Sequence, residues 1–385
     1  MTLSTPPRRV YLDYAATTPT DPRAAEVMLH YLTAAYGNPS SLHFAGREAR
    51  RALEDARATF AAGLGAQPQE IVFTGSGSEA DNLALIGVAQ AHRGAGRHII
   101  VSSIEHHAIL ETGKYLAAHG FDVDYLPVDA WGVVAPDTLR QALRPDTILV
   151  SIMHANNEIG TIQPIVELAA IAHERNCLFH CDAVQTVGQL PVDVRTLGVD
   201  LLTFSAHKFY GPKGVGGLYV RAGVNLTPLI HGGFQEAKRR AGTENVAGIA
   251  GAAKAFELAQ QHLSDEAVRL THLRDSLWEQ IGRRIADVRL NGHPTRRLPN
   301  NVNVSFKGVE AEGLLLKLSQ AGIAASMGSA CTSESIEPSH VIQALGLPAD
   351  WERGVLRFTL GCQTTAEDID YTVEVLARSV PAVRA

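Results

Sequence analysis

The sequence predicts an α/β protein with a large domain, built on a mostly parallel seven-stranded sheet, and a smaller α/β domain. Two observations predict this fold class. From about residue 46, amphipathic stretches alternate with short β-branched and apolar runs, the pattern of βαβ units. After about residue 250, an alanine-rich, charge-laced stretch is followed by shorter strands and helices. We expect the large domain over residues 15–255 and the smaller one over residues 1–14 and 256–385.

The expected elements follow this alternation. A helical stretch at 47–64 and another at 78–92 accompany strands expected at 70–73, 98–101, 123–126, 147–152, 178–181, 201–204 and 217–220. A helix over 246–284 is long enough to bridge two domains. Beyond it, strands at 301–306, 322–325 and 355–359 alternate with helices near 310–321, 338–345 and 366–378. Because no low-complexity linker separates the domains, we expect them to pack closely around a site.

Composition and charge exclude several classes of protein. The 385 residues carry 34 basic and 40 acidic side chains, and their basic clusters are short, so we expect no nucleic-acid partner. No apolar run is long enough for a membrane span or a signal peptide. The four cysteines fit no zinc-binding spacing, and they are too few to stabilise a chain of this length by disulfide bonds. We therefore expect a soluble, cytoplasmic protein without a metal site.

A glycine-rich loop, residues 74–79, lies between an expected strand and an expected helix. Small residues there, Gly77 and Ser78 among them, let backbone N–H groups approach an anion at the positive end of the helix dipole. The loop suits a phosphate, although an ordinary turn with Ser78 as the helix N-cap fits the spacing equally well. It matches neither a Walker loop nor a dinucleotide fingerprint.

Lys208 follows the strand expected at 201–204. A lysine at an apolar strand end loses solvation, which favours the neutral amine that forms Schiff bases. Ser205 and His207 beside it offer hydrogen-bond donors for a phosphate. The alternative is a surface lysine before a turn. A nucleotide loop at 211–217 is excluded, because that run lacks the helix-opening serine or threonine.

Three further strand ends carry polar groups, as expected where a doubly wound sheet holds its ligand. Asp182 suits a protonated pyridine nitrogen and Asn157 a ring hydroxyl. His106 suits either stacking on a flat ring or a catalytic proton transfer. Each also has a structural reading, such as Asp182 capping a helix. Together with the phosphate loop and Lys208, these groups describe a pyridoxal 5′-phosphate site.

A last pair of residues distinguishes among enzymes with such a site. Cys331 lies in a run of small polar residues, 325–334, which predicts an exposed, mobile loop and a reactive thiol. Cys177, Cys181 and Cys362 have strand-like surroundings and are expected to pack. Arg357, between apolar strand residues, suits either a substrate carboxylate or a structural ion pair.

The chain resembles the cysteine desulfurases, pyridoxal-phosphate-dependent enzymes of aminotransferase class V and fold type I. The resemblance runs almost end to end, from Tyr11-Leu12-Asp13-Tyr14-Ala15-Ala16-Thr17-Thr18-Pro19 through Arg240-Ala241-Gly242-Thr243-Glu244-Asn245 to Arg357-Phe358-Thr359-Leu360-Gly361. Its most specific matches are Ser205-Ala206-His207-Lys208 with Gly211-Pro212-Lys213-Gly214, and Gly328-Ser329-Ala330-Cys331-Thr332. The loop around Cys331 resembles the family group in which this loop is long. The resemblance implies an enzyme that converts L-cysteine to L-alanine and holds the sulfur on Cys331 as a persulfide.

The resemblance also implies roles for individual residues. Lys208 would form the Schiff base, and His106 would stack on the cofactor ring. The ring nitrogen would pair with Asp182, and the ring hydroxyl side with Asn157 and Gln185. The phosphate would be held by Gly77, Ser78, Ser205, His207 and, from a second subunit, Thr243. The substrate carboxylate would be bound by Asn38 and Arg357.

The resemblance implies a homodimer that passes sulfur to an acceptor protein for iron–sulfur clusters, another thio-cofactor or thiolated tRNA. With Ala385 as the last residue of the sequence, we expect no C-terminal tail of the kind that some relatives use to dock a scaffold, so the acceptor stays open. Ser78 replaces the threonine of many relatives and keeps the hydroxyl. The alternatives are a selenocysteine lyase or another class V aminotransferase or lyase, and a non-enzymatic scaffold, which Lys208 argues against.

Overall fold

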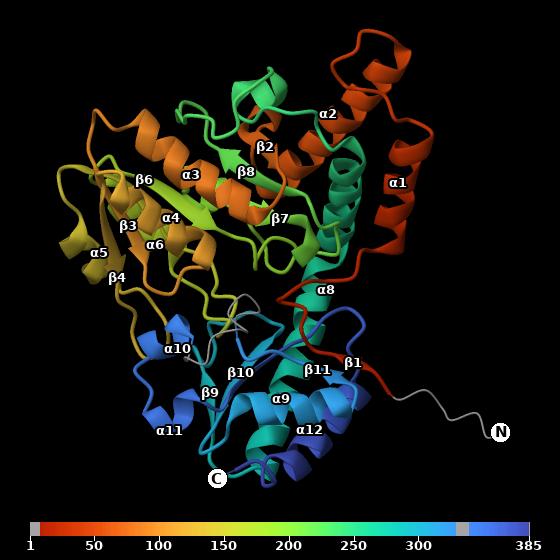
Figure 1. The fold of residues 1–385 in the computed structure, drawn as a ribbon, viewed down its shortest axis with the longest axis vertical. Coiled ribbons are helices and arrows are strands. Elements are labelled where there is room, and N and C mark those ends of the chain that lie inside the picture. Colours follow the sequence, from red (N-terminus) through yellow and green to blue (C-terminus); the bar gives the residue numbers. More distant parts are fainter. Residues whose placement is uncertain (1–7, 329–338, 385) are drawn as a thin grey trace.

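The structure is a computed structural model that describes residues 8–328 and 339–384. It has a larger part around a seven-stranded sheet and a smaller part around a three-stranded sheet, and the helix α8 (Val246–Arg284) runs from one to the other (Figure 1). Each part has its own hydrophobic core. The first half of α8 packs in one core and the second half in the other.

The large sheet confirms the prediction. Its strand order is β2-β8-β7-β6-β5-β3-β4, and β8 is the strand that runs antiparallel to its neighbours. Each predicted strand begins and ends within one residue of the observed one. The observed strands are Ile71–Thr74 (β2), His98–Ser102 (β3), Asp122–Leu126 (β4), Thr147–Ser151 (β5), Leu178–Asp182 (β6), Leu201–Ser205 (β7) and Gly216–Val220 (β8).

Helices cover both faces of this sheet, which is why its inner strands are buried along their whole length (Figure 1). The edge strand β4 has exposed positions instead. The covering helices are α2 (Phe44–Leu64), α3 (Gly77–Ala91), α4 (His107–Ala118), α5 (Pro136–Ala142), α6 (Ile165–His173) and α7 (Val194–Leu197), with α1 (Pro22–Thr33) packed on α8. Short 3₁₀ turns lie at Pro68–Glu70, Ala206–Lys208 and Gln235–Lys238.

The smaller part is an antiparallel sheet in the order β12-β10-β9. Two of its strands lie where predicted, and the predicted strand at 322–325 shortens to two residues that pair with β1. Its elements are β1 (Val10–Tyr11), β9 (Val288–Asn291), β10 (Asn301–Phe306), α9 (Ala311–Gln320), β11 (Ile323–Ala324), α10 (His340–Ala344), α11 (Ala349–Glu352), β12 (Val355–Thr359) and α12 (Ala366–Ser379). The domain boundaries at 14/15 and 255/256 stay a prediction.

Strand direction determines where the polar strand ends meet. Thr74, Asp182 and Ser205 end β2, β6 and β7, which run in one direction, so they lie at one edge of the large sheet. That edge faces the smaller part of the molecule (Figure 1). The arrangement places functional side chains between the two parts, as expected for an open α/β sheet.

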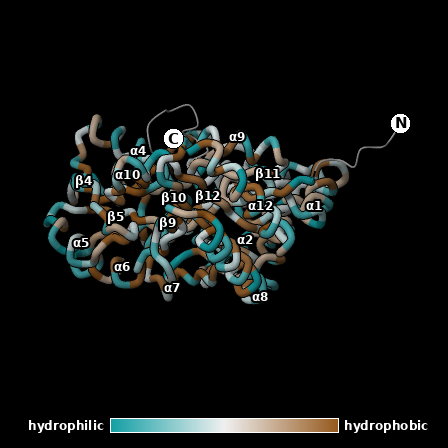
Figure 2. The backbone as a smooth tube through the Cα atoms, turned by 90° about the horizontal axis from the view of Figure 1, so that it is seen from below, coloured by the Kyte–Doolittle hydropathy of each residue, from teal (hydrophilic) through white to brown (hydrophobic). Residues whose placement is uncertain are grey.

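Covering helices such as α2 and α4 are amphipathic, with hydrophilic and hydrophobic positions alternating along them (Figure 2), whereas most of α3 is buried. Among the described residues, none of the helices combines the length and apolar character needed to cross a bilayer.

An aromatic cluster fixes the end of β7. Phe60 of α2 stacks on Phe204 of β7 and on Phe256 of α8, with ring centroids 4.7 Å apart in both pairs. Phe209, just beyond Lys208, contacts both Phe60 and Phe256 edge-on. The residues that carry Lys208 therefore lie on a rigid apolar base.

We expect Phe60→Ala to lower the free energy of unfolding by about 3–5 kcal/mol, because the substitution leaves a cavity at the centre of this cluster. Urea unfolding followed by circular dichroism measures the loss. Leu316→Ala, at a side chain that is 59% exposed on α9, is the matched control and should change stability by less than about 0.5 kcal/mol. Equal urea midpoints of unfolding for the two variants would contradict a stabilising role of the aromatic cluster.

Candidate active site

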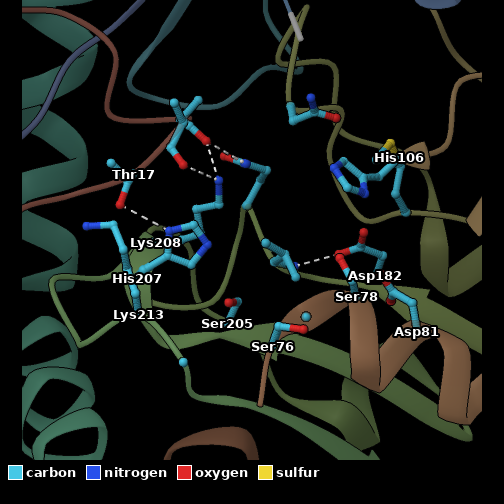
Figure 3. Close-up of a pocket in the computed structure, with 18 of the residues that line it drawn as sticks. Thr17, Ser76, Ser78, Asp81, His106, Asp182, Ser205, His207, Lys208 and Lys213 are labelled. Atoms are coloured by element: carbon cyan, nitrogen blue, oxygen red, sulfur yellow. Dashed lines mark hydrogen bonds between the residues drawn. The ribbon is translucent and has the colours of Figure 1, made fainter. Parts of the chain in front are cut away.

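A cavity of about 430 Å³ lies at the sheet edge where the strands end. In Figure 3, Lys208 and His207 lie on one side of it, His106 and Asp182 on the other, and Ser205 below. The predicted site residues that line it are Gly77, Ser78, His106, Asn157, Asp182, Gln185, Ser205, His207, Lys208 and Arg357. The sequence thus predicted most of the cavity wall.

The N-terminus of α3 opens into the cavity. Ser76, not Ser78, caps the helix, since its Oγ accepts the Glu79 N–H at 3.0 Å. Ser78 lines the cavity instead, together with Ser205. A Cβ on Gly77 would lie 3.0 Å from Val184 Cγ2, so a larger residue would crowd this cradle. Backbone N–H groups, hydroxyls and the helix dipole here suit a phosphate.

Lys208 points into the cavity from the turn after β7. Its Nζ donates hydrogen bonds to the carbonyl oxygens of Ala15 and Ala16, the latter at 2.8 Å. The neighbouring His207 ring lies 3.1 Å from Thr17 Oγ1, and burial, together with the Lys208 charge, lowers its pKa to about 4. Residues of the N-terminal segment therefore hold both side chains in place.

Asp182 and His106 line the opposite side. Asp182 accepts the Val184 N–H at 2.9 Å, and burial raises its pKa to about 6, although the Val184 bond and Lys208 oppose that rise. His106 caps α4, since its Nδ1 accepts the Ala108 N–H at 3.1 Å. Burial, and to a lesser extent Lys208, lowers the pKa of His106 to about 4. The ring is neutral at pH 7, with its hydrogen on Nε2.

Arg357 forms the structural ion pair that was one of its two predicted roles, and substrate binding stays a prediction. Its Nη2 pairs with Asp13 Oδ1 at 2.8 Å, and its Nη1 donates to the Asn157 carbonyl oxygen at 3.0 Å. The buried Nε has no hydrogen-bond partner, and the side chain lines the cavity. Gln185 Nε2 donates to the Ala15 carbonyl oxygen at 3.2 Å.

Two predicted residues lie away from the cavity. Asn38 is exposed between α1 and α2, where its Oδ1 accepts the Ser40 N–H at 2.9 Å. Thr243 is exposed on the loop before α8. Cys331 lies outside the described residues.

The other cysteines correct one prediction. Cys177 and Cys181 are buried, as expected. Cys362 was expected to pack, but it is exposed, because it follows the end of β12 and leaves the sheet after Gly361.

Sequence reasoning assigned no role to several lining residues: Thr17, Ser76, Asp81, Met153 and Lys213. Thr17 and Lys213 lie within motifs that carry the family resemblance, and this position in the motifs could have indicated that they line the site. Asp81 had a subtler signal, an acidic residue among the apolar positions of a helix whose buried face contacts the sheet.

Comparison with known proteins agrees with this geometry. Residues 10–372 match the family model "Aminotransferase class-V". The chain is 56% identical over 377 residues to "Cysteine desulfurase IscS" of Dictyoglomus turgidum, covering 98% of this chain and 96% of the relative. The chain belongs to the cysteine desulfurases of the class-V aminotransferase family.

Solved structures show the same likeness. A "NIFS-LIKE PROTEIN" superposes on the enzyme with a TM-score of 0.92 at 41% identity, covering 98% of this chain and all of that one. The structure of "SspA in complex with cysteine" has a TM-score of 0.82 at 38% identity, covering 91% of this chain and 98% of the other. These matches confirm fold type I and an enzyme that depends on pyridoxal 5′-phosphate.

The residues present fit that cofactor. The cavity joins an anion cradle at the α3 N-terminus to the amine of Lys208 and to the buried carboxyl of Asp182, whose Oδ1 accepts one backbone hydrogen bond. A phosphate, an aldehyde and a protonated ring nitrogen are complementary to these three groups. The neutral ring of His106 supplies a flat surface on the same side as Asp182 (Figure 3).

The buried histidines near the cavity predict a pH effect on stability. Burial lowers the pKa of His154 to about 4, from the ordinary 6.5. The unfolded chain protonates this ring below about pH 6.5 while the folded protein does not, so the contribution of His154 weakens as the pH falls from 6.5 toward 4. We expect His154→Gln to be less stable than wild type at pH 7. The difference in unfolding free energy between wild type and variant should be smaller by roughly 2 kcal/mol at pH 5 than at pH 7.

Urea unfolding at both pH values measures this gap. His154→Asn, whose side chain is shorter and also does not titrate, should show the same pH dependence. A gap that stays constant between pH 7 and pH 5 would contradict a neutral His154 in the folded protein.

Proposed function

We propose that this chain converts L-cysteine to L-alanine with Lys208 and Cys331 as its catalytic residues, the sulfur being held on Cys331 as a persulfide. The observation that carries the proposal is the placement of Lys208, Asp182 and the α3 N-terminus around one cavity. The related structure with bound cysteine supports cysteine as the substrate.

Pyridoxal 5′-phosphate supplies an aldehyde for the substrate amine and a ring that accepts electron density from the substrate carbon. Asp182 would hold a negative charge toward the ring nitrogen and thereby keep it protonated. Gly77, Ser78, Ser205 and His207 would hold the phosphate at the start of α3, and Asn157 and Gln185 would contact the ring hydroxyl side. His106, neutral and held as a helix cap, would stack on the ring.

Lys208 moves the proton. The Lys208 amine, once free, would act as the base that takes the hydrogen from the substrate Cα. The Ala15 and Ala16 carbonyl oxygens, which accept hydrogen bonds from Nζ, would orient this amine.

Arg357 binds the substrate carboxylate. Its Nε is buried without a partner, while Asp13 and the Asn157 carbonyl hold the other end of the guanidinium. A carboxylate at Nε would satisfy that donor and complete a charge-assisted bond. Asn38, the second residue expected at the carboxylate, does not reach the cavity of its own chain, so its role stays a prediction.

Cys331 takes the sulfur. Its thiolate attacks the substrate sulfur, a sulfur–sulfur bond forms, and the carbon–sulfur bond breaks with its electron pair left on carbon, which is then protonated to alanine. The chain leading to Cys331 begins beside the cavity, because Ser326 and Arg357 exchange backbone hydrogen bonds of 3.1 and 2.7 Å. The acceptor of the sulfur is a protein, whose identity stays open.

The enzyme acts as a homodimer in which Thr243 of one subunit completes the phosphate site of the other. Thr243 is exposed and lies outside its own cavity. Large apolar side chains are exposed near the start of α2 and on the loop that carries Thr243, a surface suited to a second subunit. They are Tyr36, Leu42, Phe44 and Phe234. The cytoplasmic location stays a prediction.

Incubation of the purified protein with L-cysteine and a reductant tests the reaction. Wild type should yield alanine and sulfide. Cys331→Ala should keep the visible absorption band of the bound cofactor and lose sulfide formation, because the nucleophile is absent. Lys208→Ala should lose turnover and change that band.

Cys177→Ala, at a buried cysteine, is the matched control and should retain activity. If Cys331→Ala turned over as fast as wild type, a lyase or transaminase reaction would replace the desulfurase assignment.

The dimer is tested by light scattering after gel filtration. We expect wild type to have the mass of two chains and Phe44→Glu, at a side chain that is 77% exposed, to have the mass of one, because a buried unpaired charge opposes association. Leu316→Glu on α9 is the control and should remain a dimer. A wild type with the mass of a single chain would contradict the shared phosphate site.

A further inference from the structure

A second carboxyl lies beside Asp182 at the cavity. Asp81, in the second turn of α3, lines the cavity and is 2% exposed (Figure 3). Its Oδ1 is buried and has no hydrogen-bond partner. An ionised carboxylate in such a place loses its hydration without compensation, which is costly.

The basic group facing Asp81 does not stabilise a negative charge. His180 Nε2 of β6 lies 3.8 Å from Oδ1, and burial lowers the pKa of His180 to about 3, so this ring is neutral. No lysine or arginine of the described chain forms an ion pair with Asp81. Thr203 of β7 donates a hydrogen bond that lowers the pKa of Asp81, but burial raises that pKa more.

The other titratable neighbours are acids. Asp182 of β6 and Glu105, which precedes α4, both act on Asp81 electrostatically and raise its pKa, after burial itself. The Cys181 thiol of β6 is also nearby and fully buried, and burial raises its pKa as well. Each element packed against Asp81 therefore presents a neutral or a negative group to it.

Two adjacent buried carboxyls share one proton, and their surroundings decide which one keeps it. Asp182 accepts the Val184 N–H and lies close enough to Lys208 to be stabilised as an anion. Asp81 Oδ1 has neither kind of partner. The proton therefore belongs on Asp81.

We propose that Asp81 is a positioning residue that stays protonated at neutral pH and thereby leaves Asp182 as the ionised carboxyl that faces the cofactor ring nitrogen. This inference rests on the proposed function for the role of Asp182. It predicts that Asp81 is needed as a neutral hydrogen-bonding group and not as a charge.

Infrared spectroscopy of the holoenzyme tests the protonation directly. At pH 7 wild type should show the carbonyl stretch of protonated carboxylic acids, and Asp81→Asn should lose one component of it. Glu105→Gln is the control for the other buried acid, whose pKa burial raises to about 8, and should remove a different component. An Asp81→Asn spectrum with every component of wild type would overturn the proposal. If that variant does not fold, the same loss is expected for Asp81→Ser.

Cofactor affinity tests the consequence. The dissociation constant of pyridoxal 5′-phosphate, measured by fluorescence titration of the cofactor-depleted enzyme, should change less than about threefold in Asp81→Asn at pH 7. It should rise about tenfold or more in Asp182→Asn, which removes the charge-assisted bond. Above neutral pH, wild-type affinity should change as Asp81 ionises, and Asp81→Asn should lack that change.

An Asp81→Asn variant that binds the cofactor as weakly as Asp182→Asn would overturn the proposal, because the charge of Asp81 would then matter. Unchanged binding by Asp182→Asn would overturn the assigned role of Asp182 and the part of the proposed function that depends on it. The infrared spectrum detects the proton on Asp81 independently of both binding measurements.

Discussion

The buried guanidinium of Arg357 joins the segments on which the site depends. From β12 in the smaller part it reaches Asp13 in the N-terminal segment and the Asn157 carbonyl in the larger part. Its own backbone pairs with Ser326, at the start of the chain that leads to Cys331. Removing one partner of such a pair leaves an uncompensated charge, so these segments are held together as a unit.

The N-terminal segment is the second constraint. It pairs with β11 in the smaller part through β1, and it then crosses to the cavity, where Ala15 and Ala16 accept hydrogen bonds from Lys208. A segment that pairs with the smaller part thus orients the amine of Lys208, which follows a strand of the large sheet. Residues 10–17 therefore contribute both to the relative placement of the two parts and to the orientation of Lys208.

Much of the fold and site could be predicted because strand patterns are local. Lys208, Asp182 and Ser205 each follow a short apolar run, and parallel strands bring such positions to one edge. Contacts between residues far apart in the sequence leave no such pattern. The strand β1 has two residues, too few to show the alternation of a strand, and Thr17 contacts His207 only because the chain folds. Asn38 and Thr243 came from resemblance alone, and a single chain does not bring them to its cavity.

The charge pattern of the cavity follows from burial. Desolvation lowers the pKa of His106, His207 and the nearby His180, and the Lys208 charge lowers the pKa of His106 and His207 further, so these rings remain neutral. The full charges at the cavity are then the cations Lys208, Lys213 and Arg357, the carboxylate of Asp182, and Asp13 paired with Arg357. A zwitterionic amino acid whose carboxylate bound Arg357, as proposed above, would bring one further charge of each sign to this site. Neutral histidines are what keep that balance, because a protonated ring beside Lys208 would repel the ammonium and compete for the substrate carboxylate.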